Sequence, residues 1–235
     1  MPPTRRKLLW QGASLIGSAV PTSVLAGGQP LHVVELYQSQ GCSSCPPANA
    51  NLLELIGRSD LICLSFGVTY WDHLGWKDTF AAPEFTARQW AYARAFGRTN
   101  VFTPQVVVNG ARDTVGASMQ DLQATLRATP TLPGDIQLHA TATEISLSGA
   151  LPATPLDLWR VGYDPSLVQI PIRSGENGGK TLPHRNVVRD LTRLVPNEGK
   201  ASSWQLPGRL RSGLKEVILA QDRGRQRILA ALPRA

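Results

Sequence analysis

The residues in this sequence best suited to chemistry are two cysteines, Cys42 and Cys45, separated by two serines. They follow an apolar stretch at 31–37 and precede Pro46-Pro47 and leucines at helical spacing, so we expect them to open a helix. A thiol there faces unpaired backbone N–H groups and the positive end of the helix dipole, which lower its pKa. We predict that Cys42 is a reachable thiolate nucleophile and that Cys45, one turn deeper, resolves a mixed disulfide.

The same spacing also suits a static disulfide or half of a metal site. Structural zinc is poorly supported, because no second pair of that spacing and no closely spaced pair of histidines follows. One alternative to exchange is a non-catalytic binding protein stapled by a Cys42–Cys45 disulfide. Another is copper handling by Cys42, Cys45 and His73, since thiolates and imidazole suit that metal. Exchange, the favoured interpretation, needs no cofactor and no metal, and Cys63 is expected to be a buried, inert thiol.

The first 26 residues have the layout of an export signal. Arg5, Arg6 and Lys7 precede a weakly apolar stretch that ends in small residues, a pattern typical of twin-arginine export or general secretion. The mature chain would begin near Gly27 and be periplasmic or secreted. Polar residues and Pro21 interrupt the apolar stretch, so it is not expected to span a membrane, and no later run replaces it.

The composition fits a folded, exported protein. The 235 residues are 42% hydrophobic, enough for a sizeable core, and only 17% charged, which is sparse for a cytosolic protein. The formal net charge is +7, of which Arg5, Arg6 and Lys7 supply three. A mildly basic chain gives no reason to expect nucleic-acid binding.

Hydrophobic periodicity predicts alternating elements after residue 30. Strands are expected at 31–37, 61–68, 105–108 and about 112–115. Helices are expected from Cys45 to about 56, at about 84–96 and at about 118–128. Asn109-Gly110 is a strong hairpin signal between the last two strands. The predicted order is strand, helix, strand, helix, hairpin, helix, in a first domain spanning 27–130.

From about residue 135 the pattern becomes mostly β. Short strands are expected at 136–140, 144–148, 156–163, 167–172, 217–219 and 227–229. We therefore expect a second, smaller β-rich domain over 135–235, a sandwich joined to the first domain through 130–134. His184, together with Arg185, Arg189 and Arg193, is expected to lie on a solvated basic face.

The loop from Thr69 to Phe80 carries many aromatic and ionisable side chains. In one interpretation it is a substrate-facing wall beside the cysteines, where Trp71 and Trp76 supply apolar contacts and Asp72 or His73 tunes the thiols. In the other it is a packed cover over the end of the sheet, in which Asp72 caps a turn. The residues alone favour neither interpretation.

A dithiol at the first strand-to-helix junction, with Thr103-Pro104 before the third strand, resembles the thioredoxin and glutaredoxin superfamily over residues 31–128. The resemblance implies a cis Pro104 that shapes a substrate groove and leaves the Thr103 backbone free to pair with a bound peptide. It also implies a buried carboxylate that relays protons to the resolving thiol. Glu35 is the candidate for that role, and the alternative is a solvated acid at the end of a strand.

Longer motifs resemble the domain-of-unknown-function family numbered 1223, which comprises secreted bacterial proteins with a thioredoxin-like fold. The motifs are Val34-Glu35-Leu36-Tyr37, the segment from Ser39 to Ala48, Tyr70-Trp71-Asp72, the segment from Leu74 to Asp78, Thr103-Pro104-Gln105-Val106 and Gly175-Glu176-Asn177. The sequence departs from the family pattern at Val68-Thr69, so no role for a histidine or aspartate there carries over. The family name itself supplies no reaction.

The expected fold class is therefore α/β, with a thioredoxin-like βαβαββα domain followed by a smaller, mostly β domain. The expected function is thiol–disulfide exchange with protein or low-molecular-weight thiol and disulfide substrates. The direction of exchange, oxidising or reducing, is left open by the sequence.

Overall fold

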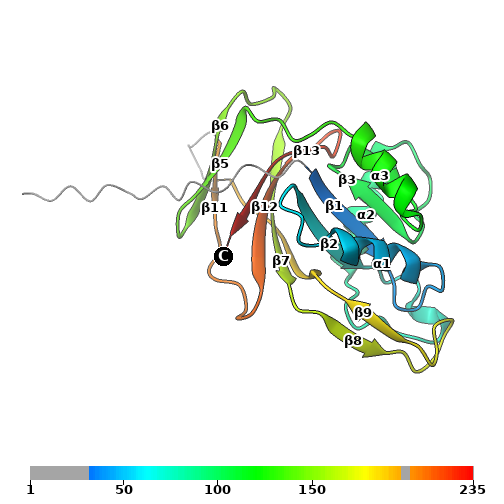
Figure 1. The fold of residues 1–235 in the computed structure, drawn as a ribbon. Coiled ribbons are helices and arrows are strands. Elements are labelled where there is room, and N and C mark those ends of the chain that lie inside the picture. The colour runs from blue at the N-terminus through cyan, green and yellow to red at the C-terminus, as the bar shows by residue number, and fades with distance from the viewer. Residues whose placement is uncertain (1–31, 197–201, 235) are drawn as a thin grey trace, which may run out of the picture.

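The computed structural model describes residues 32–196 and 202–234, which are rich in strands (Figure 1). The predicted export signal, residues 1–26, lies outside the described residues. The helices in the described residues are α1 (Cys45–Leu55), the short 3-10 helix η1 (Asp72–Leu74), α2 (Pro83–Ala95) and α3 (Met119–Ala128). The strands are β1 (His32–Gln38), β2 (Leu61–Gly67), β3 (Gln105–Val108), β4 (Arg112–Thr114), β5 (Ile136–Ala140), β6 (Glu144–Gly149), β7 (Leu156–Asp164), β8 (Val168–Pro171), β9 (Thr181–His184), β10 (Val187–Arg193), β11 (Ser203–Gln205), β12 (Lys215–Asp222) and β13 (Ile228–Arg234).

A mixed, eight-stranded sheet runs through both halves of the chain, in the order β13-β12-β7-β10-β2-β1-β3-β4. β1 pairs in parallel with β2 and antiparallel with β3. β10 joins β2 in parallel through a short contact, with Val187 opposite Ser65. The predicted α/β class is confirmed. Strands of the second half continue the sheet of the first half, because β7, β12 and β13 extend it outward from β10.

The helices cover both faces of this sheet near β1. Side chains alternate along β1, so Val34 and Leu36 point to one face and Val33 and Tyr37 to the other. The first pair packs with Leu52 of α1, and α3 covers the same face. The second pair packs with aromatic residues of α2. The alternation of β1 therefore decides which side chains approach α1, where the cysteines lie.

A second sheet, β11-β6-β5, packs on the other end of the large sheet. Their shared core contains Ile136, Leu138, Ile145, Leu147, Leu158, Trp204, Ile218, Ala220 and Ala230. Two sheets thus pack face to face, and the larger of them belongs to both halves of the chain. The predicted domain boundary at 130–135 falls between α3 and β5 and stays a prediction.

The hairpin β8-β9 extends away from the sandwich and lies beside α1 (Figure 1). Asn49 of α1 fastens it there by donating a hydrogen bond from Nδ2 to the carbonyl of Pro183, at 2.6 Å. This hairpin brings residues from the second half of the chain to the cysteine end of the sheet. Among the described helices, none has the length and apolar character that crossing a membrane requires.

Candidate functional site

The two cysteines lie where β1 turns into α1, as predicted. β1 ends at Gln38 and α1 begins at Cys45, with prolines in its first turn. The turn is closed by backbone hydrogen bonds from Cys42 N–H to Ser39 O, at 3.1 Å, and from Cys45 N–H to Cys42 O, at 3.2 Å. Prolines suit the first turn of a helix because the N–H groups there have no partner inside the helix. The sequence thus places Cys42 just before the helix and Cys45 in its first turn.

Two hydroxyl groups lie within hydrogen-bond distance of the Cys42 sulfur. Thr103 Oγ1 donates to Cys42 Sγ at 3.3 Å, and Ser44 Oγ lies 3.2 Å from it. The hydrogen bond from the Cys45 thiol is the largest influence, and it outweighs burial in lowering the pKa of Cys42 to about 6. At pH 7 a thiol with that pKa is about nine-tenths ionised. A pKa in that range favours the thiolate form of Cys42 at neutral pH.

Cys45 has the opposite ionisation. Burial, followed by its hydrogen bond to Cys42, raises the pKa of the Cys45 thiol far above the ordinary cysteine value. Neither cysteine forms a disulfide in this structure, and Cys42 has 0% and Cys45 1% exposed surface. Cys63 lies in β2, where burial raises its pKa to about 12, and it is buried as predicted.

Thr103 connects the cysteine turn to the aromatic loop. The Thr103-Pro104 peptide bond is cis. The Thr103 hydroxyl, which donates to Cys42, also accepts a hydrogen bond from Trp71 Nε1 at 2.7 Å. The Thr103 carbonyl lies 3.9 Å from Cys42 Sγ and accepts a weak bond from Ser44 Oγ at 3.4 Å. Its carbonyl is therefore directed at the dithiol turn.

The aromatic loop contacts the same turn through Gln40, a residue that the sequence did not single out. Gln40 Oε1 accepts from Trp76 Nε1 at 2.9 Å, and the Gln40 N–H donates to Asp78 Oδ2 at 2.7 Å. Asp72 Oδ1 accepts from the Asp78 N–H at 3.1 Å. These contacts favour the interpretation of the loop as a packed cover, with Asp72 binding a turn rather than a thiol.

His73 is not brought to the cysteines. It lies exposed in η1 and has no contact with either sulfur. Within residues 32–196 and 202–234, no three His, Cys, Asp or Glu side chains are grouped in a way that suits a metal ion. The geometry therefore gives no support to a copper site built from Cys42, Cys45 and His73.

Glu35 is fully buried, which corrects the alternative of a solvated acid, while the proton relay to Cys45 stays a prediction. Glu35 points to the α2 face of the sheet, because side chains alternate along β1, whereas α1 lies on the opposite face. There its carboxylate accepts from Arg88 Nε at 2.8 Å and from the hydroxyl of Tyr92. Arg88 and Glu35 are both buried, so this is an interior ion pair.

A segment from the second half of the chain covers the cysteine turn. We call residues 174–178, between β8 and β9, the strap. Glu176 Oε2 accepts from the Ser43 N–H at 3.0 Å, and Asn177 Nδ2 donates to the carbonyls of Gln40, at 3.0 Å, and Cys42, at 2.8 Å. Ser174 Oγ donates to the carbonyl of Gly75. The strap and the aromatic loop together enclose the turn, and the expectation that the Cys42 sulfur is reachable is corrected by its complete burial.

A cavity of about 240 Å³ lies between the start of α1 and β9, and Cys45 and His184 both line it. His184 is only 3% exposed, which corrects the expectation of a solvated basic face. Burial lowers the pKa of His184 to about 4, so its imidazole is neutral at pH 7. Its Nε2 has no hydrogen-bond partner among the described residues. No local sequence signal predicts this burial, because it depends on the packing of β9 against α1.

Comparisons with known proteins identify the family. The model of the family described as "Protein of unknown function (DUF1223)" matches residues 33–221. The X-ray structure of protein AGR_C_4864 from Agrobacterium tumefaciens is 27% identical, with a TM-score of 0.67 over 88% of this chain and 95% of that one. HBP35 of Porphyromonas gingivalis shares the fold at 13% identity, with a TM-score of 0.54 over 88% of this chain and 76% of that one. No protein with a curated description matches. Since the family model covers most of its length, this chain belongs to the DUF1223 family of proteins of unknown function.

Proposed function

We propose that this protein carries out thiol–disulfide exchange through Cys42 and Cys45, in a thioredoxin-like arrangement of residues 31–128. The observation that carries the proposal is the opposed ionisation of the two thiols. The pKa of Cys42 is lowered to about 6, while that of Cys45 is raised by burial. Two-step exchange needs one sulfur that attacks as a thiolate and a second that keeps its proton until the first has reacted.

Exchange proceeds in two steps. The Cys42 thiolate attacks a substrate disulfide, forms a mixed disulfide and releases the first substrate thiolate. Cys45 then loses its proton to solvent and attacks Cys42 Sγ, which forms the Cys42–Cys45 disulfide and releases the second substrate thiolate. The substrate gains the two electrons that the protein dithiol loses. The same steps in reverse oxidise a substrate dithiol.

Exchange requires the cover over Cys42 to open. The strap contacts the cysteine turn through a few polar groups, and Glu176 is an exposed residue. The hydrogen bond to Glu176 is exposed, whereas the two hydrogen bonds from Asn177 are buried. A segment held by so few contacts opens at lower free-energy cost than the core unfolds. We infer that the strap moves while the sheet remains folded, and that protein or small thiol substrates then reach Cys42. Trp71, which contacts Thr103, would line the opened site.

The burial of both sulfurs favours a second candidate, a non-catalytic binding protein in which Cys42 and Cys45 form a structural disulfide. The two candidates differ in how the pair responds to external thiols. The cysteines of an exchange site equilibrate with external thiols, whereas a buried structural disulfide does not. Both are compatible with export to an oxidising compartment, which remains a proposal based on the first 26 residues.

A trapping experiment tests the proposal. A Cys45→Ala variant with Cys63→Ser as its background cannot resolve a mixed disulfide, so it should accumulate adducts on Cys42 when expressed in its native compartment. The matched control replaces Cys42 as well and should accumulate none. If Cys42 carries no adduct, and also fails to release the coloured thiolate from an aromatic disulfide in vitro, the exchange proposal is wrong.

A further inference from the structure

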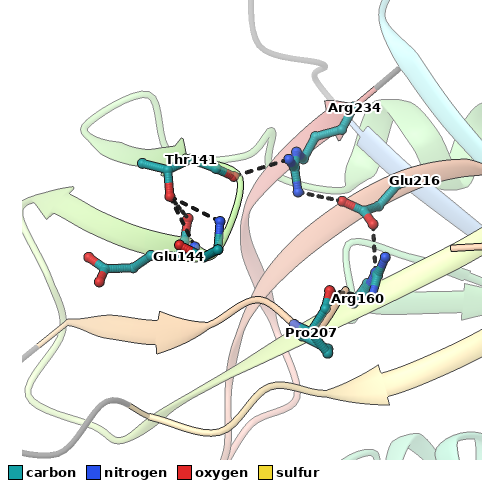
Figure 2. Close-up of polar contacts among 7 residues, drawn as sticks. Thr141, Glu144, Arg160, Pro207, Glu216 and Arg234 are labelled. Atoms are coloured by element: carbon teal, nitrogen blue, oxygen red, sulfur yellow. Dashed lines mark hydrogen bonds and ion pairs between the residues drawn. The ribbon is translucent and has the colours of Figure 1, made fainter. Parts of the chain in front are cut away.

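A row of charged side chains, of which Arg160 and Glu216 are buried, crosses three strands at the end of the large sheet far from the cysteines. Glu216 of β12 accepts from Arg160 Nε of β7 at 2.6 Å and from Arg234 Nη1 of β13 at 2.7 Å. Figure 2 shows the Glu216 carboxylate between the two guanidinium groups. Arg160 is 6% and Glu216 9% exposed. Two cations therefore share one carboxylate, which leaves one positive charge uncompensated at the sheet surface.

The loop 206–214 bends over this row and is firmly seated. Arg160 Nη1 donates to the carbonyl of Pro207 at 2.9 Å, and the Leu206 N–H donates to Thr143 O at 2.8 Å. Leu210 packs against Gly162, where a Cβ atom would meet Leu210 Cδ1 at 2.9 Å. The loop is therefore anchored at its start by hydrogen bonds and at its middle by packing.

Loop and strands enclose a cavity of about 510 Å³, which has the size of a small-molecule site. Its charged lining consists of Arg160, Arg209, Arg211, Arg234 and Glu216, an excess of three positive charges. The guanidinium groups of Arg209 and Arg211 make no ion pair or hydrogen bond with any residue in 32–196 or 202–234. Within the same ranges, Arg160 Nη2 has no partner although the residue is nearly buried.

We propose that this cavity binds a small molecule with two or more negative charges, carried by phosphate or carboxylate groups. Guanidinium groups match the oxygens of both through paired N–H donors. The Glu216 carboxylate already lies between Arg160 and Arg234. The ligand would therefore bind the N–H groups that remain, on Arg160 of the sheet and on Arg209 and Arg211 of the loop. This site is independent of Cys42 and of the proposed exchange reaction.

The test is isothermal titration calorimetry at fixed, low ionic strength, with pyrophosphate in one arm and succinate in the other. Saturable binding of either probe to the wild-type protein supports the site and shows which oxyanion it prefers. Arg209→Gln with Arg211→Gln should weaken binding about tenfold or more, since each hydrogen bond to a charged group contributes strongly. The matched control, Arg94→Gln with Arg127→Gln, removes the same charge from exposed positions of α2 and α3 and should change the Kd less than twofold.

Two results would overturn the proposal. One is the lack of saturable binding for both probes. The other is equal weakening by the two double variants, which would mean that diffuse positive charge attracts the probes. If the glutamine variant melts at a lower temperature than the wild type, Arg209→Lys with Arg211→Lys replaces it. Those lysines keep the charge and lose the paired donors, so binding should still fall severalfold, and unchanged binding there counts against the proposal.

Discussion

The hydroxyl of Thr103 donates a hydrogen bond to the sulfur of Cys42 at 3.3 Å and accepts one from the indole of Trp71 at 2.7 Å. One side chain thus connects the nucleophile to the aromatic loop that covers it. Since a hydroxyl has one hydrogen, the Trp71 N–H fixes the Thr103 proton toward Cys42. The orientation favours the thiolate form of Cys42.

Replacing Thr103 by Val should therefore raise the pKa of Cys42. Hydrogen bonds to charged groups contribute about 1.5–3 kcal/mol, so we expect a rise of roughly one to two pKa units. Ultraviolet thiolate absorbance, followed as a function of pH in a Cys63→Ser background, measures it without requiring an exposed sulfur. Thr125→Val in α3, where the hydroxyl donates to the Asp121 carbonyl, is the matched control. A Thr103 variant that titrates like the wild type would refute the assigned contact.

The Glu35–Arg88 pair should matter for stability and not for the thiols. Removing one partner of a buried ion pair leaves the other charge uncompensated, so Glu35→Gln should lower the free energy of unfolding by about 3–5 kcal/mol. Denaturant unfolding measures this loss, and Glu84→Gln at an exposed position of α2 is the control. The pKa of Cys42 should stay unchanged in both variants. A shifted thiol titration in Glu35→Gln would support the proton-relay hypothesis.

His184 should make the protein sensitive to acid. Its pKa of about 4 in the folded protein lies below the ordinary histidine value, so between these two values the unfolded chain binds a proton at His184 and the folded chain does not. Protonation of His184 therefore has no effect on the free energy of unfolding above about pH 6.5, and lowers it by up to about 3 kcal/mol as the pH falls from about 6.5 to 4. Thermal melting of wild type and His184→Gln across that range should show a smaller acid loss in the variant, with exposed His73→Gln behaving as wild type. Parallel curves for all three proteins would contradict the burial of a neutral His184.

The strap should limit access to Cys42. Glu176 accepts the Ser43 N–H, an interaction that lowers the pKa of the Glu176 carboxyl. Glu176→Ala removes the acceptor, so iodoacetamide should alkylate Cys42 several times faster while the melting temperature changes little. Glu176→Gln keeps an acceptor oxygen and should react at an intermediate rate. Equal rates in all three proteins would mean that another segment controls access.

Local sequence signals sufficed for the elements that carry the cysteines. Alternation in β1, prolines in the first turn of α1 and the Asn109-Gly110 hairpin each act within a few residues of the feature they predict. The residues that contact the site from distant parts of the chain could not be predicted from local signals. Glu35 meets Arg88 across 53 positions and Ser43 meets Glu176 across 133. Such contacts arise from packing between distant segments, which no local pattern encodes.

The addition of β10 to the sheet also depends on packing between segments that are distant in the sequence. Its contact with β2 is a single pair, Val187 with Ser65, supported by Asn186 Nδ2 donating to the Cys63 carbonyl at 2.9 Å. Neither residue is unusual in sequence. The burial of His184 likewise follows from β9 lying against α1, where Asn49 binds Pro183. Local sequence patterns therefore suggested a separate β-rich domain and a solvated histidine.

The central claim is that Cys42 and Cys45 exchange electrons with external thiols. Its most direct test incubates the protein with graded ratios of reduced and oxidised glutathione and measures the fraction that carries the Cys42–Cys45 disulfide. We predict a reversible equilibrium with a reduction potential above about −300 mV. A pair that stays wholly disulfide-bonded at every ratio, or that never forms the disulfide, would contradict the account.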